Sequence, residues 1–367
     1  MLLAALVTLP LVVVPTARVD VPLGAFTDQS TNVTGALTLG PGTARTLAPV
    51  RSGIAVYPPR TLPKPANSVN VDVDATVPVG ATVAVDVRGE RPDHDWTEWT
   101  SGTLGVSTSV IQVRVVLTAP DDVGAPTVRR VSLSTSDGPQ PVATASEYRV
   151  FATREGLVGG TTANGHVITS RDHFVALPSR RGLSPKGTGT YTAKVCAANG
   201  RCAWAPVWDV GPWNTHDDYW NPTRENWSDL PKGTPQAQAA YLDGYNRGVD
   251  QFGRKVANPA GVDLADGTFW DGLALKGNSW VTVTYLWHQA GPSGYVRTAG
   301  DTLNARSSPS TDAPVTGMAA NYAQVRVECQ ATGETVNDNA AWYRIAPRMY
   351  VAAAFVTGVT KAPTCAG

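Results

Sequence analysis

Residues 69–77, VNVDVDATV, alternate apolar and polar side chains along almost their whole length. Successive side chains of a β-strand point to opposite faces, so this pattern is typical of a strand with one buried face. The alternation recurs in three further runs: TVAVDVRG (82–89), IQVRVVLTA (111–119) and VRRVSLST (128–135). Because Pro, Gly and Asp turn residues separate the runs, we predict an antiparallel β-sandwich for residues 18–135.

The composition extends this prediction to the whole chain. A chain of 367 residues is too long for one ordinary core, so two or three domains are expected. The 42% of hydrophobic residues can fill real cores, and 28 prolines and 35 glycines without a period indicate many turns and short strands. The sequence therefore predicts a mainly β fold.

Two stretches have the composition of linkers, and they divide the chain into three domains. The linkers are residues 136–147 (SDGPQPVATASE) and 288–294 (HQAGPSG). The central domain, 148–287, contains a long polar insertion, 214–259. The Ala-rich segment 236–245 lacks proline and is the best helix candidate of the chain. The C-terminal domain spans residues 295–367.

The charge balance and the motifs exclude several classes of function. Thirty basic residues balance thirty acidic ones, and no Lys/Arg run exceeds two residues, so nucleic acid is not an expected partner. The glycine-rich segment 156–165, GLVGGTTANG, matches neither a P-loop nor a dinucleotide-binding fingerprint. We expect neither a cofactor nor a metal.

The first 17 residues, MLLAALVTLPLVVVPTA, form an apolar run of signal-peptide length. The run is short and contains prolines, so it is a poor candidate for a stable membrane span. We predict an export signal and a secreted or wall-associated protein. A positively charged start is missing, which leaves open a start codon assigned too far downstream, an atypical signal, or a buried strand.

Four cysteines support the same compartment. Cys196 and Cys202 flank an Asn-Gly dipeptide at 199–200, which is typical of a type I′ hairpin turn, so their side chains could meet across paired strands. Cys329 and Cys365 would then pair by elimination. A zinc site is a weak alternative, because there is no CxxC spacing and no histidine at ligand spacing.

The central domain contains a series of segments whose order resembles the double-psi β-barrel of the rare lipoprotein A family. They are GGTTANGHV (159–167), DHFVALP (172–178), APVWDVGPW (205–213), GVDLADGTF (261–269) and VTVTYLW (281–287). Members of this family include lytic transglycosylases, which cleave peptidoglycan glycan strands without water. The resemblance therefore implies a double-psi β-barrel that acts on a glycan.

The resemblance also implies roles for three polar residues. Asp209 matches the position of the general acid, and its place among tryptophans at a strand end would favour the protonated carboxyl group. His173 matches a second catalytic position, as a hydrogen-bonding or proton-relay partner of Asp209. Asp263 matches an aspartate beside the sugar groove. The alternative for both aspartates is a plain turn residue.

Further residues are candidates for substrate binding. Thr162 and Asn164 could donate hydrogen bonds to sugar hydroxyls, although Asn-Gly is also a common turn. Eight of the eleven tryptophans lie between residues 204 and 287, and indole rings stack well on sugars. Trp208, Trp213 and Trp220 lie nearest to Asp209 in the sequence. Some of the eight must instead fill the core of the domain.

The C-terminal domain resembles the bacterial SH3-like family. The hallmark LNARSSPS stands at residues 303–310, and the later strand WYRI at residues 342–345. Such domains usually attach exported enzymes to the wall. The combined prediction is a secreted protein that acts on peptidoglycan or another wall glycan, with Asp209 as general acid. Two alternatives stay open: an expansin-like protein that binds or loosens wall glycans without cleaving them, and a purely structural or interaction protein.

Overall fold

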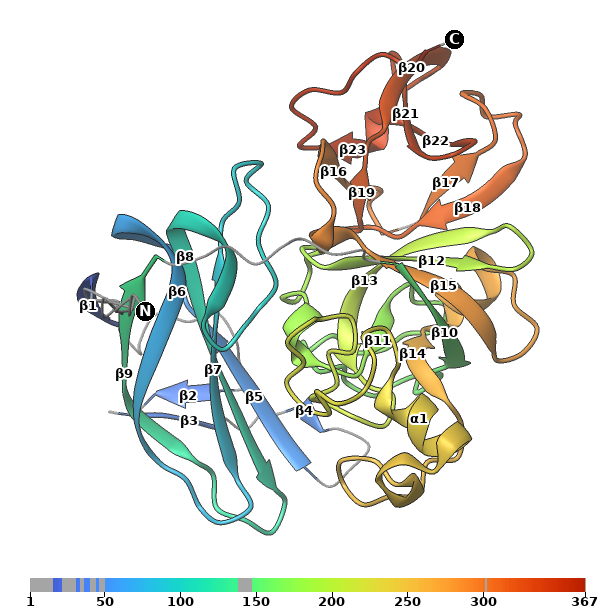
Figure 1. The fold of residues 1–367 in the computed structure, drawn as a ribbon. Helices are drawn as coiled ribbons and strands as arrows, with labels where there is room; N and C mark the ends of the chain where they lie inside the picture. The colour runs from blue at the N-terminus through green and yellow to red at the C-terminus, as the bar shows by residue number, and fades with distance from the viewer. Residues whose placement is uncertain are drawn as a thin grey trace, which may run out of the picture.

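The computed structural model describes residues 16–21, 31–33, 36–39, 44–45, 50–137, 147–300 and 302–366. It is mainly β with barrel-shaped sheets, which confirms the predicted fold class. Figure 1 shows three bodies, with the N-terminal body on one side and the central and C-terminal bodies stacked on the other. Most of the predicted export signal, and the linker residues 138–146, lie outside the described residues. No helix in the described ranges is long and apolar enough to cross a membrane.

The described residues of the N-terminal body form one hydrogen-bonded sheet of nine strands. Two long strands, β6 and β8, organise it: the first half of β8 pairs with β6, and its second half pairs with β5 and β7. The alternating apolar residues of the long strands face a common core. The strands are β1 (Thr16–Asp20), β2 (Thr31–Val33), β3 (Leu37–Leu39), β4 (Ala44–Arg45), β5 (Val50–Val56), β6 (Arg60–Thr76), β7 (Thr82–Gly89), β8 (Thr103–Pro120) and β9 (Thr127–Ser136).

The central body is a closed barrel of six strands. The pairings run in a ring, β11–β14–β10–β15–β12–β13, and β13 returns to β11. Small and branched side chains such as Ala193, Val207 and Val283 fill its interior. The strands are β10 (Glu147–Arg154), β11 (Val175–Leu177), β12 (Thr192–Ala197), β13 (Cys202–Val210), β14 (Ala260–Leu264) and β15 (Ser279–Tyr285).

Short helices lie in the connections of the barrel. They are η1 (Arg180–Gly182), α1 (Gln236–Asp243), η2 (Tyr245–Gly248), η3 (Thr268–Gly272) and η4 (Leu286–His288). The predicted helix in the insertion is confirmed as α1, and it ends where Gly244 adopts a left-handed conformation with φ of 68°. The long connection between β13 and β14 therefore carries the principal α-helix of the described chain.

The C-terminal body continues the sheet of the barrel. Strand β18 pairs in parallel with β13, and Gly317 lies so close to Cys202 that an added Cβ would be 2.2 Å from the Cys202 carbonyl oxygen. Any side chain at residue 317 would therefore push the two bodies apart. The elements are β16 (Ser293–Val296), β17 (Leu303–Arg306), β18 (Val315–Ala319), β19 (Gln324–Arg326), β20 (Cys329–Val336), β21 (Asn339–Ala346), β22 (Met349–Ala352), η5 (Ala353–Phe355) and β23 (Val356–Thr357).

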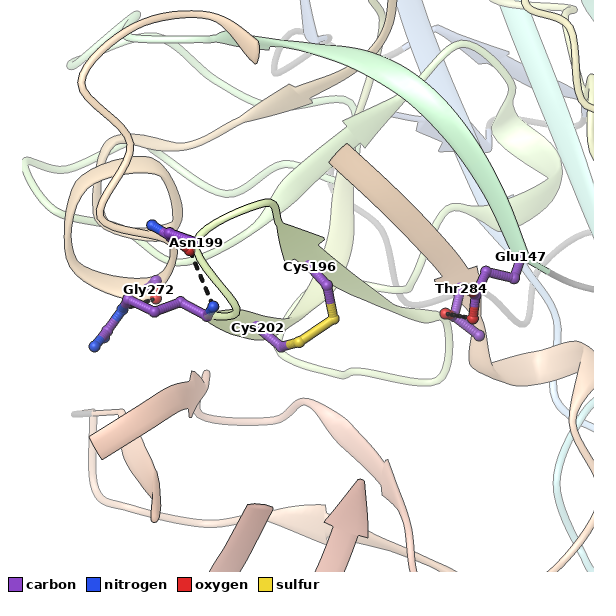
Figure 2. Close-up of a disulfide and its surroundings, with 7 residues drawn as sticks. Glu147, Cys196, Asn199, Cys202, Gly272 and Thr284 are labelled. Atoms are coloured by element: carbon purple, nitrogen blue, oxygen red, sulfur yellow. Dashed lines mark hydrogen bonds between the residues drawn. A yellow bond between two sulfur atoms is a disulfide. The ribbon is translucent and has the colours of Figure 1, made fainter. Parts of the chain in front are cut away.

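Both predicted disulfides are present, Cys196–Cys202 and Cys329–Cys365. The first links paired residues of β12 and β13, beside the turn that carries Asn199 (Figure 2). The predicted type I′ turn is wrong, because it needs positive φ at both Asn199 and Gly200 and only Gly200 has it, with φ of 83°. Ala197 instead closes a three-residue loop with Arg201, and the disulfide spans it.

A loop of the N-terminal body, residues 90–99, contacts both other bodies. Asp95 accepts a hydrogen bond from Gln324 at 2.8 Å and pairs with Arg326 at 3.0 Å, both in the C-terminal body. Glu98 accepts a hydrogen bond from the indole N–H of Trp220 at 2.6 Å, and Trp99 packs in the core of the central body. The loop therefore fastens the three bodies together.

Candidate active site

Four side chains form a row across four adjacent strands of the barrel. Thr153 on β10 is paired with Asp263 on β14, Asp263 with Ala176 on β11, and Ala176 with Asp209 on β13. Directly paired residues of neighbouring strands point to the same face. The strand register thus brings together the two aspartates that the sequence analysis singled out. Strand β11 lies between their strands and contributes only the small Ala176 to the row.

The row lies on the outer face of the barrel. Ala152, Val262 and Leu264 belong to the barrel core. Side chains alternate along a strand, so the intervening Thr153 and Asp263 point outward. An outward row can meet a long polymer, whereas the barrel interior is filled.

Glu155 joins the row and was missed by the sequence analysis. It lies two residues beyond Thr153, just after β10, where its N–H donates to the Leu264 carbonyl at 2.9 Å. Both of its carboxyl oxygens are buried and accept no hydrogen bond from a described N–H group or hydroxyl, and its side chain lies within hydrogen-bonding reach of the Asp209 carboxyl group. Burial, and next the charge of Asp209, raises the pKa of Glu155 well above its ordinary value. The neutral, protonated acid is therefore its favoured form.

Asp209 is held by backbone donors. Its Oδ1 atom accepts hydrogen bonds from the N–H groups of Ala163 at 2.7 Å and Val210 at 2.8 Å. Burial raises the pKa of Asp209, while the neighbouring Glu155 side chain and the two N–H groups lower it. Glu155 and Asp209 thus form a neighbouring pair in which backbone donors favour the charge on Asp209 and the lack of donors favours the proton on Glu155.

Asp263 completes the carboxyl cluster. It accepts a hydrogen bond from the Thr153 hydroxyl, and burial raises its pKa to about 7. Its Oδ2 atom lies beside Gly211, where an added Cβ would be 3.8 Å away. Three carboxyl groups with raised pKa values therefore share one face of the barrel. We call Glu155, Asp209 and Asp263 the carboxyl row. The described residues contain no group of three or more His, Cys, Asp or Glu side chains suited to holding a metal ion.

Thr162 and Asn164 position the site rather than facing a ligand. The Thr162 side chain is buried and donates to Asn164 Oδ1 at 2.7 Å, and Asn164 Nδ2 donates to the Ser184 carbonyl at 3.1 Å. These bonds shape the turn that presents the Ala163 N–H group to Asp209. The predicted donation to sugar hydroxyls is not what their contacts provide, since both side chains are used inside the protein.

His173 is not brought into contact with Asp209 by any described interaction. Its Nε2 atom lies 4.0 Å from a carboxyl oxygen of Asp271, and burial lowers its pKa. The acidic neighbour of Asp209 is instead Glu155. The catalytic role predicted for His173 stays a prediction, without a partner in the carboxyl row.

The three predicted sugar-stacking tryptophans differ in exposure. Trp220 is fully buried among Tyr219 and Tyr285, so its predicted place in a groove is wrong: the loop 90–99 covers it. Trp208 is 8% exposed and stacks on Phe174. Trp213 is half-buried, and its N–H group donates to Asn258 at 3.0 Å. Of the three, Trp213 retains the largest accessible ring.

The N-terminal body bounds one end of the row. Ala163 and Val210, whose N–H groups hold Asp209, pack against Ile54 of that body and against the barrel residue Leu183. Arg180 is buried, bonds with the N-terminal body, and its positive charge lowers the pKa of Asp209. The N-terminal body therefore encloses the Asp209 end of the row.

Comparison with known families gives one match. The model of a family described as a domain of unknown function (DUF8814) matches residues 146–284, which include the six strands of the barrel except Tyr285, the last residue of β15. A search of curated proteins found no match for this chain. The similarity to that family thus covers the barrel and its carboxyl row.

Proposed function

We propose that this protein is exported and cleaves the glycan strands of peptidoglycan, or of a related wall polysaccharide, by proton donation from the Glu155–Asp209 pair. The observation that carries the proposal is the outward carboxyl row, in which three acids hold raised pKa values without a salt-bridge partner among the described residues. A general acid must carry its proton near neutral pH, and burial among other acids provides that condition. The resemblance to rare lipoprotein A supports the same substrate.

The proposed reaction needs one acid that later acts as a base. The acid gives its proton to the glycosidic oxygen as the bond from that oxygen to the anomeric carbon breaks. The C6 hydroxyl of the same muramyl sugar attacks the anomeric carbon, and its proton returns to the carboxylate. The products are a shortened strand and a 1,6-anhydro end, and no water is consumed.

The three acids take different parts in this scheme. Glu155 stores the proton, because no donor stabilises its ionised form. Asp209, fixed by the N–H groups of Ala163 and Val210, stabilises positive charge that develops on the sugar and exchanges the proton with Glu155. Asp263 keeps the proton on Glu155 through its own charge.

Export and attachment to the wall are part of the proposal. Two disulfides favour an oxidising compartment, and the apolar first 17 residues favour a signal. The C-terminal body, similar in sequence to SH3-like domains, would hold the barrel near its polymer. Its direct pairing with β13 supports a fixed rather than a loosely tethered arrangement.

Digestion of purified, peptide-stripped peptidoglycan tests the proposal, with products identified by mass spectrometry. We expect 1,6-anhydromuramyl products from the wild type and a loss of about 10²- to 10⁴-fold in Glu155→Gln and Asp209→Asn. Asp229→Asn changes an exposed acid of the insertion and is the matched control. Glycan binding without products from any form would contradict cleavage and favour the expansin-like alternative.

A further inference from the structure

We propose that Trp270 and four charged neighbours form a binding subsite for a neutral sugar ring beside the Glu155 end of the carboxyl row. The neighbours are Arg154, Arg171, Asp266 and Asp271, and the group is named the Trp270 patch. The proposal rests on the proposed function, because it identifies the part of the glycan that lies beyond the reacting bond.

The centre of the Trp270 patch is an accessible indole ring. Trp270 lies on η3 and is 40% exposed, in contrast to Trp220 and Trp208. The guanidinium carbon of Arg154 lies 4.8 Å from the ring centroid, and that of Arg171 lies 5.0 Å away. The two arginines hold the ring in place, which lowers the entropy cost of ordering it around a ligand.

The charges of the Trp270 patch favour a neutral ligand. Arg154 pairs with Asp266 at 2.8 Å and Arg171 with Asp271 at 3.4 Å, so two positive charges are matched by two negative ones. A phosphate or a polyanion would meet both aspartates. A sugar hydroxyl, in contrast, can accept from a guanidinium and donate to a carboxylate, while the apolar face of the sugar packs on the part of the indole that the two guanidinium groups leave exposed.

The exposed donors remain available for such contacts. The side chain of Arg154 is 43% exposed and that of Arg171 is 52% exposed, although each makes an ion pair. A guanidinium carries five N–H donors, more than one carboxylate can use. Each arginine can therefore bond to a ligand without releasing its aspartate.

Position connects the Trp270 patch to the reacting groups. Arg154 directly precedes Glu155, and Asp266 lies just after β14, three residues beyond Asp263 of that strand. The charge of Asp266 acts on Glu155, so the two carboxyl groups lie near each other. A sugar held at Trp270 would therefore belong to the same strand as the sugar at the row, and longer oligosaccharides should bind more tightly than short ones.

Titration calorimetry with chitohexaose, an oligomer of N-acetylglucosamine, tests the subsite in an Asp209→Asn background that prevents turnover. We expect Trp270→Ala to bind about tenfold more weakly, which corresponds to about 1.4 kcal/mol, and Trp270→Phe to recover part of the loss. Tyr241→Ala removes an aromatic ring that is 51% exposed on α1 and should bind like the parent. Near-ultraviolet circular dichroism checks that each variant is folded.

Equal affinity of Trp270→Ala and its parent for chitohexaose would overturn the subsite. So would the lack of measurable binding of chitohexaose by the parent. A loss in Tyr241→Ala as large as that in Trp270→Ala would also overturn it. Peptidoglycan digestion by the wild type separates this proposal from the proposed function. Weaker binding in Trp270→Ala together with no anhydro products would uphold the subsite and reject cleavage.

Discussion

Two clusters of acids lie in the central body, and they differ in whether the acids form ion pairs with arginines. In the insertion, Asp217 pairs with Arg224, and Asp218 pairs with Arg181. In the carboxyl row, Glu155, Asp209 and Asp263 form no salt bridge with a described residue. Asp217 and Asp218 are fully buried and the acids of the row are half-buried, and the main difference lies in what surrounds each carboxyl group.

The contrast indicates a structural role for the paired acids and a chemical role for the acids of the row. Burial raises the pKa values of Asp217 and Asp218 to about 6, which leaves both mostly ionised at neutral pH beside their arginines. Asp217 also accepts the N–H group of Gln236 at 2.6 Å, at the start of α1. These acids fasten the insertion. The acids of the row, which lack such partners, retain protons that a reaction can use.

Breaking the compensated cluster should have the largest effect on stability. Arg224→Met leaves the buried Asp217 without its cation, so we expect the free energy of unfolding to fall by about 3 to 5 kcal/mol at pH 7. Denaturant unfolding followed by tryptophan fluorescence reports mainly the central body, where most tryptophans lie. Arg247→Met, at an exposed arginine of the same insertion, is the control. Equal losses in both variants would contradict the contrast.

Neutralising the uncompensated cluster should instead stabilise the protein. Asp263 has a folded pKa of about 7 against an ordinary value of 3.8, so the folded state binds more protons between these pH values. Stability is thus fully present below about pH 4 and is lost as pH rises through about 7. We expect Asp263→Asn to gain up to about 4 kcal/mol over wild type at pH 8 and almost nothing at pH 4.

The matched variant in the other cluster is Asp217→Asn. The folded pKa of Asp217 is raised only to about 6, because the charge of Arg224 offsets part of the effect of burial, so we expect a smaller gain of stability at pH 8 than in Asp263→Asn. The measurement is thermal unfolding of both variants at pH 4 and pH 8. Equal gains at both positions would mean that Asp263 is compensated to the same degree as Asp217.

The pH dependence of cleavage also tests the difference between the two clusters, and the expected effect is smaller than the effects on stability. Activity needs the proton on Glu155, so it should fall as pH rises through the raised pKa of that group. The charge of Asp263 helps to raise this pKa, and Asp263→Asn should therefore move the alkaline limb of kcat/KM to lower pH. An unchanged limb would show that Glu155 is not the proton donor.

The β architecture could be predicted because its signals are local. The alternation in residues 69–77 and 128–135 defines strands that lie in β6 and β9, and Cys196 and Cys202 face each other across one hairpin. The resemblance also selected Asp209 and Asp263, which the register of β11 then places in one row. These features depend on neighbours in one strand or one pair of strands.

The remaining features depend on contacts between distant parts of the chain. Glu155 belongs to no motif, and only the pairing of β10 with β14 brings it to the row. Trp220 looked like a groove residue, but a loop of another body, through Glu98, covers it. A sequence pattern in one body does not show which of its side chains a second body will bury. The burial of Thr162 likewise depends on contacts that the sequence pattern does not show, here those within its own turn.

The smallest expected effect concerns His173, the residue for which the resemblance and the contacts differ most. Its carboxylate neighbour is Asp271, outside the carboxyl row, and burial lowers its pKa, so it is neutral near pH 7. We expect His173→Asn to retain cleavage within about threefold of wild type, since a proton relay alone would be worth about 10²-fold or more. The same digestion and mass spectrometry measure it beside Glu155→Gln. A loss in His173→Asn as large as that in Glu155→Gln would restore the histidine as the partner of Asp209 and remove the distinction between the row and its surroundings.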